Sequence, residues 1–241
     1  ERMGRFFMHR ADLAIATQAR YLQTLRRASS QGATMIAPAS WVNQEEIISA
    51  DQLIYSWEKK RHAIPIRLLF AGRMSQDKGI HILLGAIDII QNSGLEVQID
   101  LIGEGSLREI CSTHASNIRP PLVVKVLQPV SYGPVFFSLL RNYHAVLIPS
   151  LGDEQPRILF DAFTQGVPVI ATDTDGIAPY VSKNVGWLIA KGKSDALALA
   201  ISDVVSNPHE LERRGILAHQ SIQNMTHRDM HIRRSREIAK L

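Results

Sequence analysis

The sequence has few cysteines, few aromatic residues and no long apolar runs. Its 241 residues include a single cysteine, Cys111, so no disulfide forms within the chain, which suits a reducing compartment. No apolar run is long enough to cross a bilayer, and no charged start with an apolar core indicates a signal peptide. Aromatic residues make up 6% of the chain, and no nucleic-acid-binding motif is present. We therefore expect a cytoplasmic protein without a nucleic-acid partner.

Positive charge is in modest excess and gathers at the two ends. The net charge is +4, and residues 1–66 carry nine Lys and Arg against six Asp and Glu, while residues 207–241 carry seven against four. Such an excess is typical of proteins that bind nucleic acid, anionic membranes or phosphate-bearing ligands, and a solvated helical face is the alternative for the last segment. Because the chain begins with Glu1 rather than Met, we expect a fragment or an excised domain.

Apolar strands alternate with amphipathic helices from residue 64 onward. Strands that alternate with helices of about ten residues or more pair in parallel through right-handed crossovers. The pattern predicts an α/β fold with a doubly wound, Rossmann-like parallel sheet. Strands are expected at 64–72, 95–103, 121–127, 144–150, 167–173 and 185–190, and helices at 78–91, 106–115, 135–142, 156–166, 194–207 and over the last thirty residues, with a break at Asn207-Pro208.

Residues 1–62 follow this pattern less regularly. A strand at 11–18, a helix at 19–30 and a strand at 34–38 are expected, followed by a mixed stretch at 41–62. We interpret residues 1–62 as the tail of another α/β unit plus a linker, and residues 63–241 as the main domain.

The stretch AGRMSQDKG at 71–79 joins a predicted strand end to a helix start. Ligands of open α/β sheets bind beyond the carboxyl ends of the strands. Arg73 and Lys78, together with the free N–H groups of the new helix, would form a phosphate site. The alternative is a helix start at Asp77 and Lys78 with Arg73 on the surface.

The stretch LIGEGSLRE at 101–109 has the same position on the next strand. Gly103 and Gly105 begin a G-x-G-x-x-G pattern, but its third position is Arg108, so the dinucleotide fingerprint fails. Two interpretations stay open: a tight turn where the backbone approaches a ligand, and a plain strand-to-helix turn.

The stretch GDEQPRILFDAF at 152–163 places acids before and inside a helix that should begin near Pro156. A carboxylate at Asp153 or Asp161 could accept hydrogen bonds from sugar or ribose hydroxyls. The alternatives are a helix cap at Asp153 and an ion pair between Asp161 and Arg157.

Two further clusters are best explained as surface features. Asp173 and Asp175 form a D-x-D pair that suits a metal and a diphosphate, but a polar loop is the more common origin of this pattern. His227 and His231 lie four residues apart, yet Arg228 replaces the Glu that the zinc-protease pattern needs. We expect no metal site.

Taken together and in order, these motifs resemble the nucleotide-sugar-binding half of GT-B glycosyltransferases of the retaining family four. The resemblance covers about residues 64–240 and includes VLIPSLGDEQPRILFDAFTQGVPVIATDTDGI and VGWLIAKGKSDALALAI. It implies that Arg73 and Lys78 hold the donor diphosphate. Asp153 and Asp161 match two family Glu separated by seven residues, of which the first faces the donor sugar and the second the ribose. The resemblance therefore implies three catalytic residues, Arg73, Lys78 and Asp153, and the donor-binding residues Gly72, Gly103, Glu154, Gln155, Pro156, Arg157, Ile158 and Asp161.

The chain departs from the family pattern at three points. Both acids are Asp rather than Glu, and Glu154 stands where the family usually has Gly and is a second candidate for the role of the first acid. The family's glycine-rich acceptor loop and N-domain histidine have no counterpart. We therefore expect the chain to bind donor as the C-terminal half of a larger enzyme, with the isolated fragment inactive.

The resemblance implies transfer of a sugar from a nucleoside diphosphate sugar to an acceptor hydroxyl, with retention and without a metal or other cofactor. The implied partners are the nucleotide sugar, a glycan or lipid-linked acceptor and, from the basic ends, a membrane surface. The alternatives are a GT-B-like nucleotide-sugar epimerase and a non-catalytic nucleotide-sugar-binding module.

Overall fold

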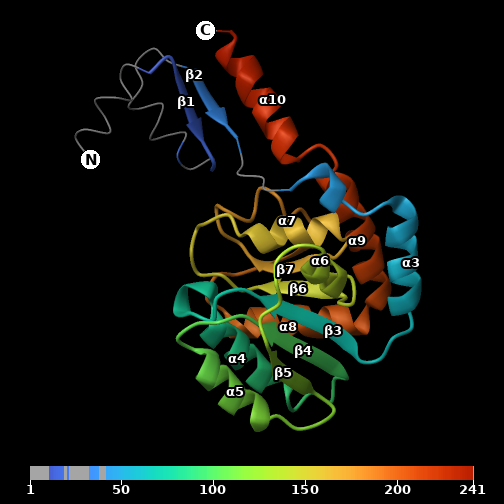
Figure 1. Ribbon diagram of the computed structural model, residues 1–241. Helices are drawn as coiled ribbons and strands as arrows, with labels where there is room; N and C mark the ends of the chain where they lie inside the picture. The colour runs from blue at the N-terminus through green and yellow to red at the C-terminus, as the bar shows by residue number, and fades with distance from the viewer. Residues whose placement is uncertain (1–10, 19–20, 22–32, 38–41, 241) are drawn as a thin grey trace, which may run out of the picture. The chain divides into compact units, whose positions relative to one another are not determined.

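The computed structural model describes residues 11–18, 21, 33–37 and 42–240 (Figure 1). The chain divides into two compact units. Residues 44–223 form the sheet domain, and residues 1–43 with 224–241 form the small unit. The predicted boundary near residue 62 falls inside the sheet domain, and the last helix groups with the small unit. The assignment of residues 1–62 to another domain of a longer enzyme stays a prediction.

Six parallel strands form the sheet of the larger unit, in the order β5-β4-β3-β6-β7-β8. This confirms the predicted doubly wound α/β architecture. Strand β3 pairs with β4 on one side and β6 on the other, so Leu68 lies beside both Ile99 and Ala145. The strands are β3 Ile66–Ala71, β4 Val97–Ile102, β5 Val123–Leu127, β6 Ala145–Ile148, β7 Val169–Thr172 and β8 Gly186–Ile189. Every residue of β6 and β7 is buried, as expected for strands covered on both faces.

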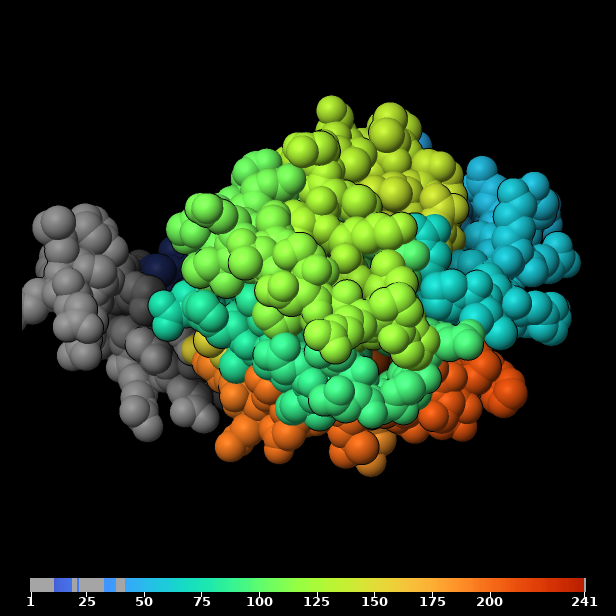
Figure 2. All heavy atoms as spheres, turned by 90° about the horizontal axis from the view of Figure 1, so that it is seen from below, coloured from blue at the N-terminus to red at the C-terminus, as the bar shows by residue number. Residues whose placement is uncertain are grey.

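Two groups of helices cover the sheet. Helix α4 packs against α5 and α8, whereas α7 packs against α6 and α9 (Figure 1). Seen from below, residues of α5, β5 and α6 in green fill the middle of the face, and α3 in light blue lies at its side (Figure 2). No described helix is long and apolar enough to span a bilayer. The helices are α4 Ile80–Ile90, α5 Arg108–Ser116, α6 Pro134–Leu140, α7 Arg157–Thr164, α8 Ser194–Ser206 and α9 Pro208–Ile222.

Helix α3, Ala50–Lys60, comes from the mixed stretch and belongs to the sheet domain. It begins with a capping box in which the side chains of Ser49 and Gln52 bond to each other's backbone N–H groups. Trp57 is almost fully buried, and its indole N–H donates to the carbonyl of Gly166 at 3.1 Å. Gly215 of α9 lies against both of these groups. Because contacts with residues more than a hundred positions away hold this helix, it packs as part of the domain rather than as a linker.

The small unit contains two parallel strands and one helix among its described residues. Strands β1 Leu13–Ala16 and β2 Ala33–Ile36 pair in register, which confirms the strands predicted at 11–18 and 34–38. The helix predicted at 19–30 lies outside the described residues apart from Tyr21. Helix α10, His227–Ile238, starts at a capping box formed by Thr226 and Asp229. The last thirty residues therefore hold a second break, which the sequence pattern did not indicate.

Gly215 should be required for the packing of α3 and α9. A Cβ at this position would meet the Trp57 ring at 2.5 Å and would overlap the carbonyl oxygen of Gly166. We expect Gly215→Ala to lower the free energy of unfolding by about 1–3 kcal/mol, as overpacking does, although Ala favours helices. Urea unfolding measures this. Gly85→Ala in α4 is the matched control, because its nearest obstacle is the rotatable Ser194 hydroxyl. Equal effects of the two substitutions on the free energy of unfolding would contradict the prediction that Gly215 is required for packing.

Candidate functional site

A pocket of about 210 Å³ opens where the strand order reverses, between β3 and β6. This is the position at which open α/β sheets bind ligands. Its apolar walls come from Phe70 and Leu147 at the ends of these strands. Five residues predicted from sequence to bind a donor line it together: Gly72, Lys78, Pro156, Arg157 and Ile158. Arg73, Gly103, Asp153, Glu154 and Gln155 lie in the loops that follow β3, β4 and β6, and Asp161 lies inside α7, all outside the lining itself.

The two glycines after β4 serve close packing of backbone on backbone. Gly103 and Gly105 have φ angles of 151° and 150°, which disfavour other residues. A Cβ at Gly103 would overlap the carbonyl oxygen of Gly72, and one at Gly105 would overlap that of Met74. Arg108 donates to the Gly103 carbonyl at 2.6 Å. In the structure these glycines therefore form a strand-to-helix turn that supports the loop carrying Arg73.

The two predicted phosphate-binding cations lie near each other. Arg73 is exposed on the loop after β3, and Lys78 ends the 3₁₀ turn Gln76–Lys78. Partial burial lowers the pKa of Lys78, Arg73 acts in the same direction, and Asp77 opposes them. The Lys78 ammonium forms an ion pair with the half-exposed Glu154. A carboxylate from the loop before α7 therefore neutralises one of the two cations.

The acids before α7 are arranged differently from a helix cap. The helix begins after Pro156, and no side chain caps it. Asp153 instead accepts a hydrogen bond from the Lys191 ammonium at 3.1 Å, so the interpretation of Asp153 as a cap is wrong. Gly176 of the D-x-D loop packs against the backbone of this segment, since a Cβ there would overlap the Glu154 carbonyl. Burial raises the pKa of Tyr180, and the neighbouring Gln155 side chain acts in the opposite direction.

Asp161 is a buried carboxylate inside α7. Its exposed fraction is 4%, and Tyr132 donates its hydroxyl proton to Oδ1 at 3.0 Å. The Arg157 Nε lies 3.9 Å from the same oxygen, so the predicted ion pair forms but is long. Burial raises the pKa of Asp161 to about 7, although the hydrogen bond from Tyr132 and the charge of Arg157 act in the opposite direction. A buried carboxylate with one close hydrogen-bond donor can accept further hydrogen bonds from a ligand's hydroxyls.

Tyr132 is the main site residue that sequence reasoning missed. Its ring stacks under the Arg157 guanidinium at 3.7 Å, and its hydroxyl reaches Asp161. It lies in the loop between β5 and α6, directly before Gly133 and Pro134, which starts that helix. The signal was available, because an aromatic residue just before a Gly-Pro helix start lies at the carboxyl edge of the sheet.

The remaining sequence clusters lie on the surface. Asp173 and Asp175 are exposed, and the ring nitrogens of His227 and His231 lie 2.9 Å apart on the surface of α10. Within the described residues, no three His, Cys, Asp or Glu side chains come together to hold a metal ion. Cys111 is a free thiol and is buried.

A family model decides the assignment of the chain. The model described as "Glycosyl transferases group 1" matches residues 65–207. The chain belongs to this family. The match starts just before β3 and ends after α8, so it contains both strands that flank the pocket.

Two curated relatives of the group 1 glycosyl transferases illustrate the similarity. The amylovoran biosynthesis glycosyltransferase AmsK of Erwinia amylovora is 29% identical over 143 residues, which are 56% of this chain and 34% of that protein. The capsular polysaccharide biosynthesis glycosyltransferase CapM of Staphylococcus aureus is 26% identical over 163 residues, which are 64% of this chain and 40% of that protein. The chain thus matches little more than a third of each relative.

Solved structures share the fold. The Anabaena protein HepE, crystallised with UDP, superposes with a TM-score of 0.78 at 19% identity and covers the whole of this chain and 67% of its own. Sucrose-phosphate synthase from Thermosynechococcus elongatus superposes with a TM-score of 0.76 at 19% identity, over 99% of this chain and 60% of its own. At this level of identity the likeness establishes the GT-B fold that the resemblance implied.

The stability of the chain should report the ionisation of Asp161. Its pKa rises from 3.8 to about 7 on folding, so the carboxylate increasingly opposes folding as the pH rises from about 4 to 7, and fully so above 7. We expect Asp161→Asn to increase the free energy of unfolding at pH 8, by at most about 4 kcal/mol, and to change it little at pH 4.5.

Urea unfolding at the two pH values measures this difference. Asp153→Asn is the matched control, because that acid is half-exposed and paired with Lys191. The same increase at both pH values would show that ionisation of Asp161 has no part in it.

Proposed function

We propose that this chain is the donor-binding half of a retaining glycosyltransferase that moves a sugar from a nucleoside diphosphate sugar to an acceptor hydroxyl. The observation that carries the proposal is the pocket at the β3–β6 switch point in a group 1 glycosyl transferase chain. Its lining joins Lys78 to the start of α7, and Asp161 lies within that helix. Transfer requires the rest of the enzyme, since acceptor recognition belongs to the other half of a GT-B protein.

Arg73, Lys78 and the first turn of α7 are proposed to hold the donor diphosphate. Pro156, Arg157 and Ile158 line the pocket at the point where α7 begins, and the first N–H groups of a helix have no partner within it. A diphosphate bound there would replace Glu154 as the ion-pair partner of the Lys78 ammonium. The apolar walls of the pocket strengthen such charge interactions because they exclude water.

Departure of the nucleoside diphosphate concentrates negative charge on its leaving oxygens. Fixed cations and N–H dipoles that bind this charge more strongly in the transition state than in the ground state accelerate the reaction. In this proposal Arg73 and Lys78 supply the charge that a metal supplies in other transferases, so no metal or other cofactor is needed. Asp153, or Glu154 in its place, faces the donor sugar.

Asp161 is proposed to accept hydrogen bonds from the ribose hydroxyls. The Tyr132 hydroxyl occupies Oδ1 in the free chain, and ribose hydroxyls would add to this bond or replace it. The shorter Asp in place of the family's Glu leaves room for Tyr132 at this position. We propose a glycan or lipid-linked sugar as acceptor, in line with the polysaccharide biosynthesis for which AmsK and CapM are named, and a cytoplasmic location at the membrane surface.

Calorimetric titration of the chain with UDP, GDP and ADP tests the donor site. We expect one of the three to bind, and Arg73→Ala and Lys78→Ala each to weaken it roughly 10- to 100-fold, the usual loss for a hydrogen bond to a charged group. Arg119→Ala is the control, because Arg119 is exposed at the opposite end of the sheet. Equal affinity in all four proteins would remove Arg73 and Lys78 from the site, and no binding of any nucleotide would count against the donor-site assignment.

A substitution of Glu154 should strengthen nucleotide binding, in contrast to the substitutions of Arg73 and Lys78. Because its carboxylate pairs with Lys78, Glu154→Gln should release the ammonium and strengthen binding of the free nucleoside diphosphate several-fold. The matching nucleotide sugar should gain less than the free nucleotide if Glu154 also contacts the sugar. Titrations of the parent and the variant with both ligands measure this. Weaker binding of the free nucleotide would mean that Glu154 orders the site rather than competing for it.

A further inference from the structure

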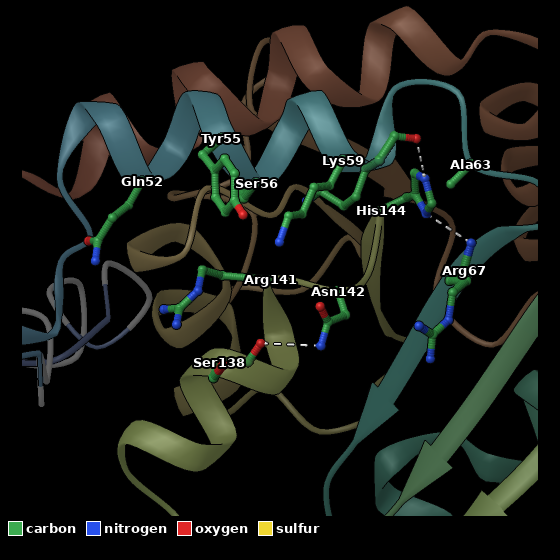
Figure 3. Close-up of a pocket in the computed structure, with 11 residues that line it drawn as sticks. Gln52, Tyr55, Ser56, Lys59, Ala63, Arg67, Ser138, Arg141, Asn142 and His144 are labelled. Atoms are coloured by element: carbon green, nitrogen blue, oxygen red, sulfur yellow. Dashed lines mark hydrogen bonds between the residues drawn. The ribbon is translucent and has the colours of Figure 1, made fainter.

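A second and larger pocket lies at the opposite end of the sheet. Its volume is about 510 Å³, and α3 forms one wall (Figure 3). The C-terminal end of α6 and the residues after it form the facing wall, with Ser138, Arg141 and Asn142, while Arg67 enters from the start of β3. This pocket belongs wholly to the sheet domain, and it shares no lining residue with the pocket at the β3–β6 switch point.

The lining of this second pocket is strongly cationic. It includes Lys59, Lys60, Arg67 and Arg141, and none of the described residues that line it is an Asp or a Glu. Asp100 pairs with Arg67 from behind the pocket. No ion pair among the described residues involves Lys59, Lys60 or Arg141. Lys59 and Arg141 therefore bring positive charge to the cavity with no carboxylate of the described residues in contact, and Lys60 is influenced only at a distance by Glu212. A concave arrangement of this kind attracts anions.

Lys60 is held in place at the inner wall. Its exposed fraction is 5%, its ammonium donates to the Tyr143 carbonyl at 3.0 Å, and it lies 3.7 Å from the centre of the Trp57 ring. Burial lowers its pKa to about 7, although Glu212 opposes this. Keeping a lysine in such a place destabilises the free chain, because Met would fill the same volume without desolvating a charge. A ligand that supplies negative charge would remove this penalty.

Arg141 and Arg67 are also oriented by neighbours. Arg141 donates to the Gln165 side chain at 2.6 Å, and burial lowers its pKa. The His144 ring bonds to the Arg67 backbone N–H at 2.9 Å and to the Lys60 carbonyl at 3.2 Å, so it ties α3 to the start of β3 (Figure 3). The cations therefore project from elements that are fixed relative to one another.

The remaining lining is rich in groups that bind oxygen-bearing ligands. Ser138, Asn142 and Gln52 provide hydroxyl and amide groups, and Tyr55 presents an exposed ring beside Lys59. Lys and Arg are the residues that bind phosphate, while hydroxyls and amides suit a polyhydroxylated body. The volume lies within the range of roughly 300–1,000 Å³ that is usual for small-molecule sites.

We propose that this pocket binds a small phosphorylated compound, with Lys59, Lys60 and Arg141 holding the phosphate. The phosphate comes either from a soluble phosphate ester or from the head group of an anionic lipid. The site is separate from the donor pocket, because Arg67 and Gly72 lie at opposite ends of β3, about 16–17 Å apart at the rise of an extended strand. It does not depend on the proposed transferase activity.

Calorimetric titration of the whole chain with glucose 6-phosphate, inorganic phosphate and glucose tests the proposal. We expect the two phosphates to bind and glucose not to bind. A double variant, Lys59→Ala with Arg141→Gln, should weaken phosphate binding at least tenfold, whereas Arg73→Ala and Arg119→Ala should leave it unchanged. Thermal unfolding of the double variant checks that it folds, and Lys60→Met, which preserves volume, gives an independent loss of binding.

Flotation with vesicles of phosphatidylglycerol or of phosphatidylcholine distinguishes the two sources. Capture by phosphatidylglycerol vesicles that is lost in the double variant would identify a lipid phosphate as the ligand. Phosphate binding that Arg73→Ala weakens and the double variant retains would overturn the proposal, because the anion would then occupy the donor pocket. Absence of binding to every phosphate and vesicle would overturn it as well, whatever the outcome of the nucleotide titrations.

Discussion

The position of β3 between β4 and β6 is the constraint on which the rest of the sheet domain depends. The chain winds outward from β3 to β5 and then returns to the other side of β3 with β6. Right-handed crossovers then place α4 and α5 on one face and α6 and α7 on the other. The loops after β3 and β6 consequently diverge and leave a pocket between them. The backbone contact of Gly103 with Gly72 holds one side of this opening.

The two pockets at opposite ends of the sheet differ in how many of their charged side chains have a partner of opposite charge within the domain. At the switch point, Lys78 has Glu154 as its partner and Asp161 has Tyr132, so a ligand meets charged groups that are already bonded. At the other end, Arg67 alone has a carboxylate partner, Asp100, among the four cations that line the second pocket. In the pocket at the β3–β6 switch point the charged groups are already paired, whereas the second pocket has positive charge in excess.

Local sequence pattern predicted most of the sheet domain because its strands are continuous apolar runs and its helices have clear stops. The topology of parallel sheets indicated Lys78 as a ligand-binding residue, whereas only the family resemblance indicated Gly72, Pro156, Arg157 and Ile158. Helix α3 was missed because its stability depends on Trp57 reaching Gly166, a contact between distant segments. The cap interpretation of Asp153 failed for a similar reason, since Lys191 comes from a loop that no local pattern connects to it.

The contact of Trp57 with Gly166 and Gly215 belongs to a compact domain that extends beyond the residues matched by the family model. The family match runs from residue 65 to residue 207, whereas the compact domain runs from residue 44 to residue 223. Helices α3 and α9 therefore lie outside the residues that the family model matches, yet they pack against the same domain. A chain trimmed to residues 65–207 would lose both helices, and the apolar surface that Trp57 covers would be exposed to water and to other copies of the chain.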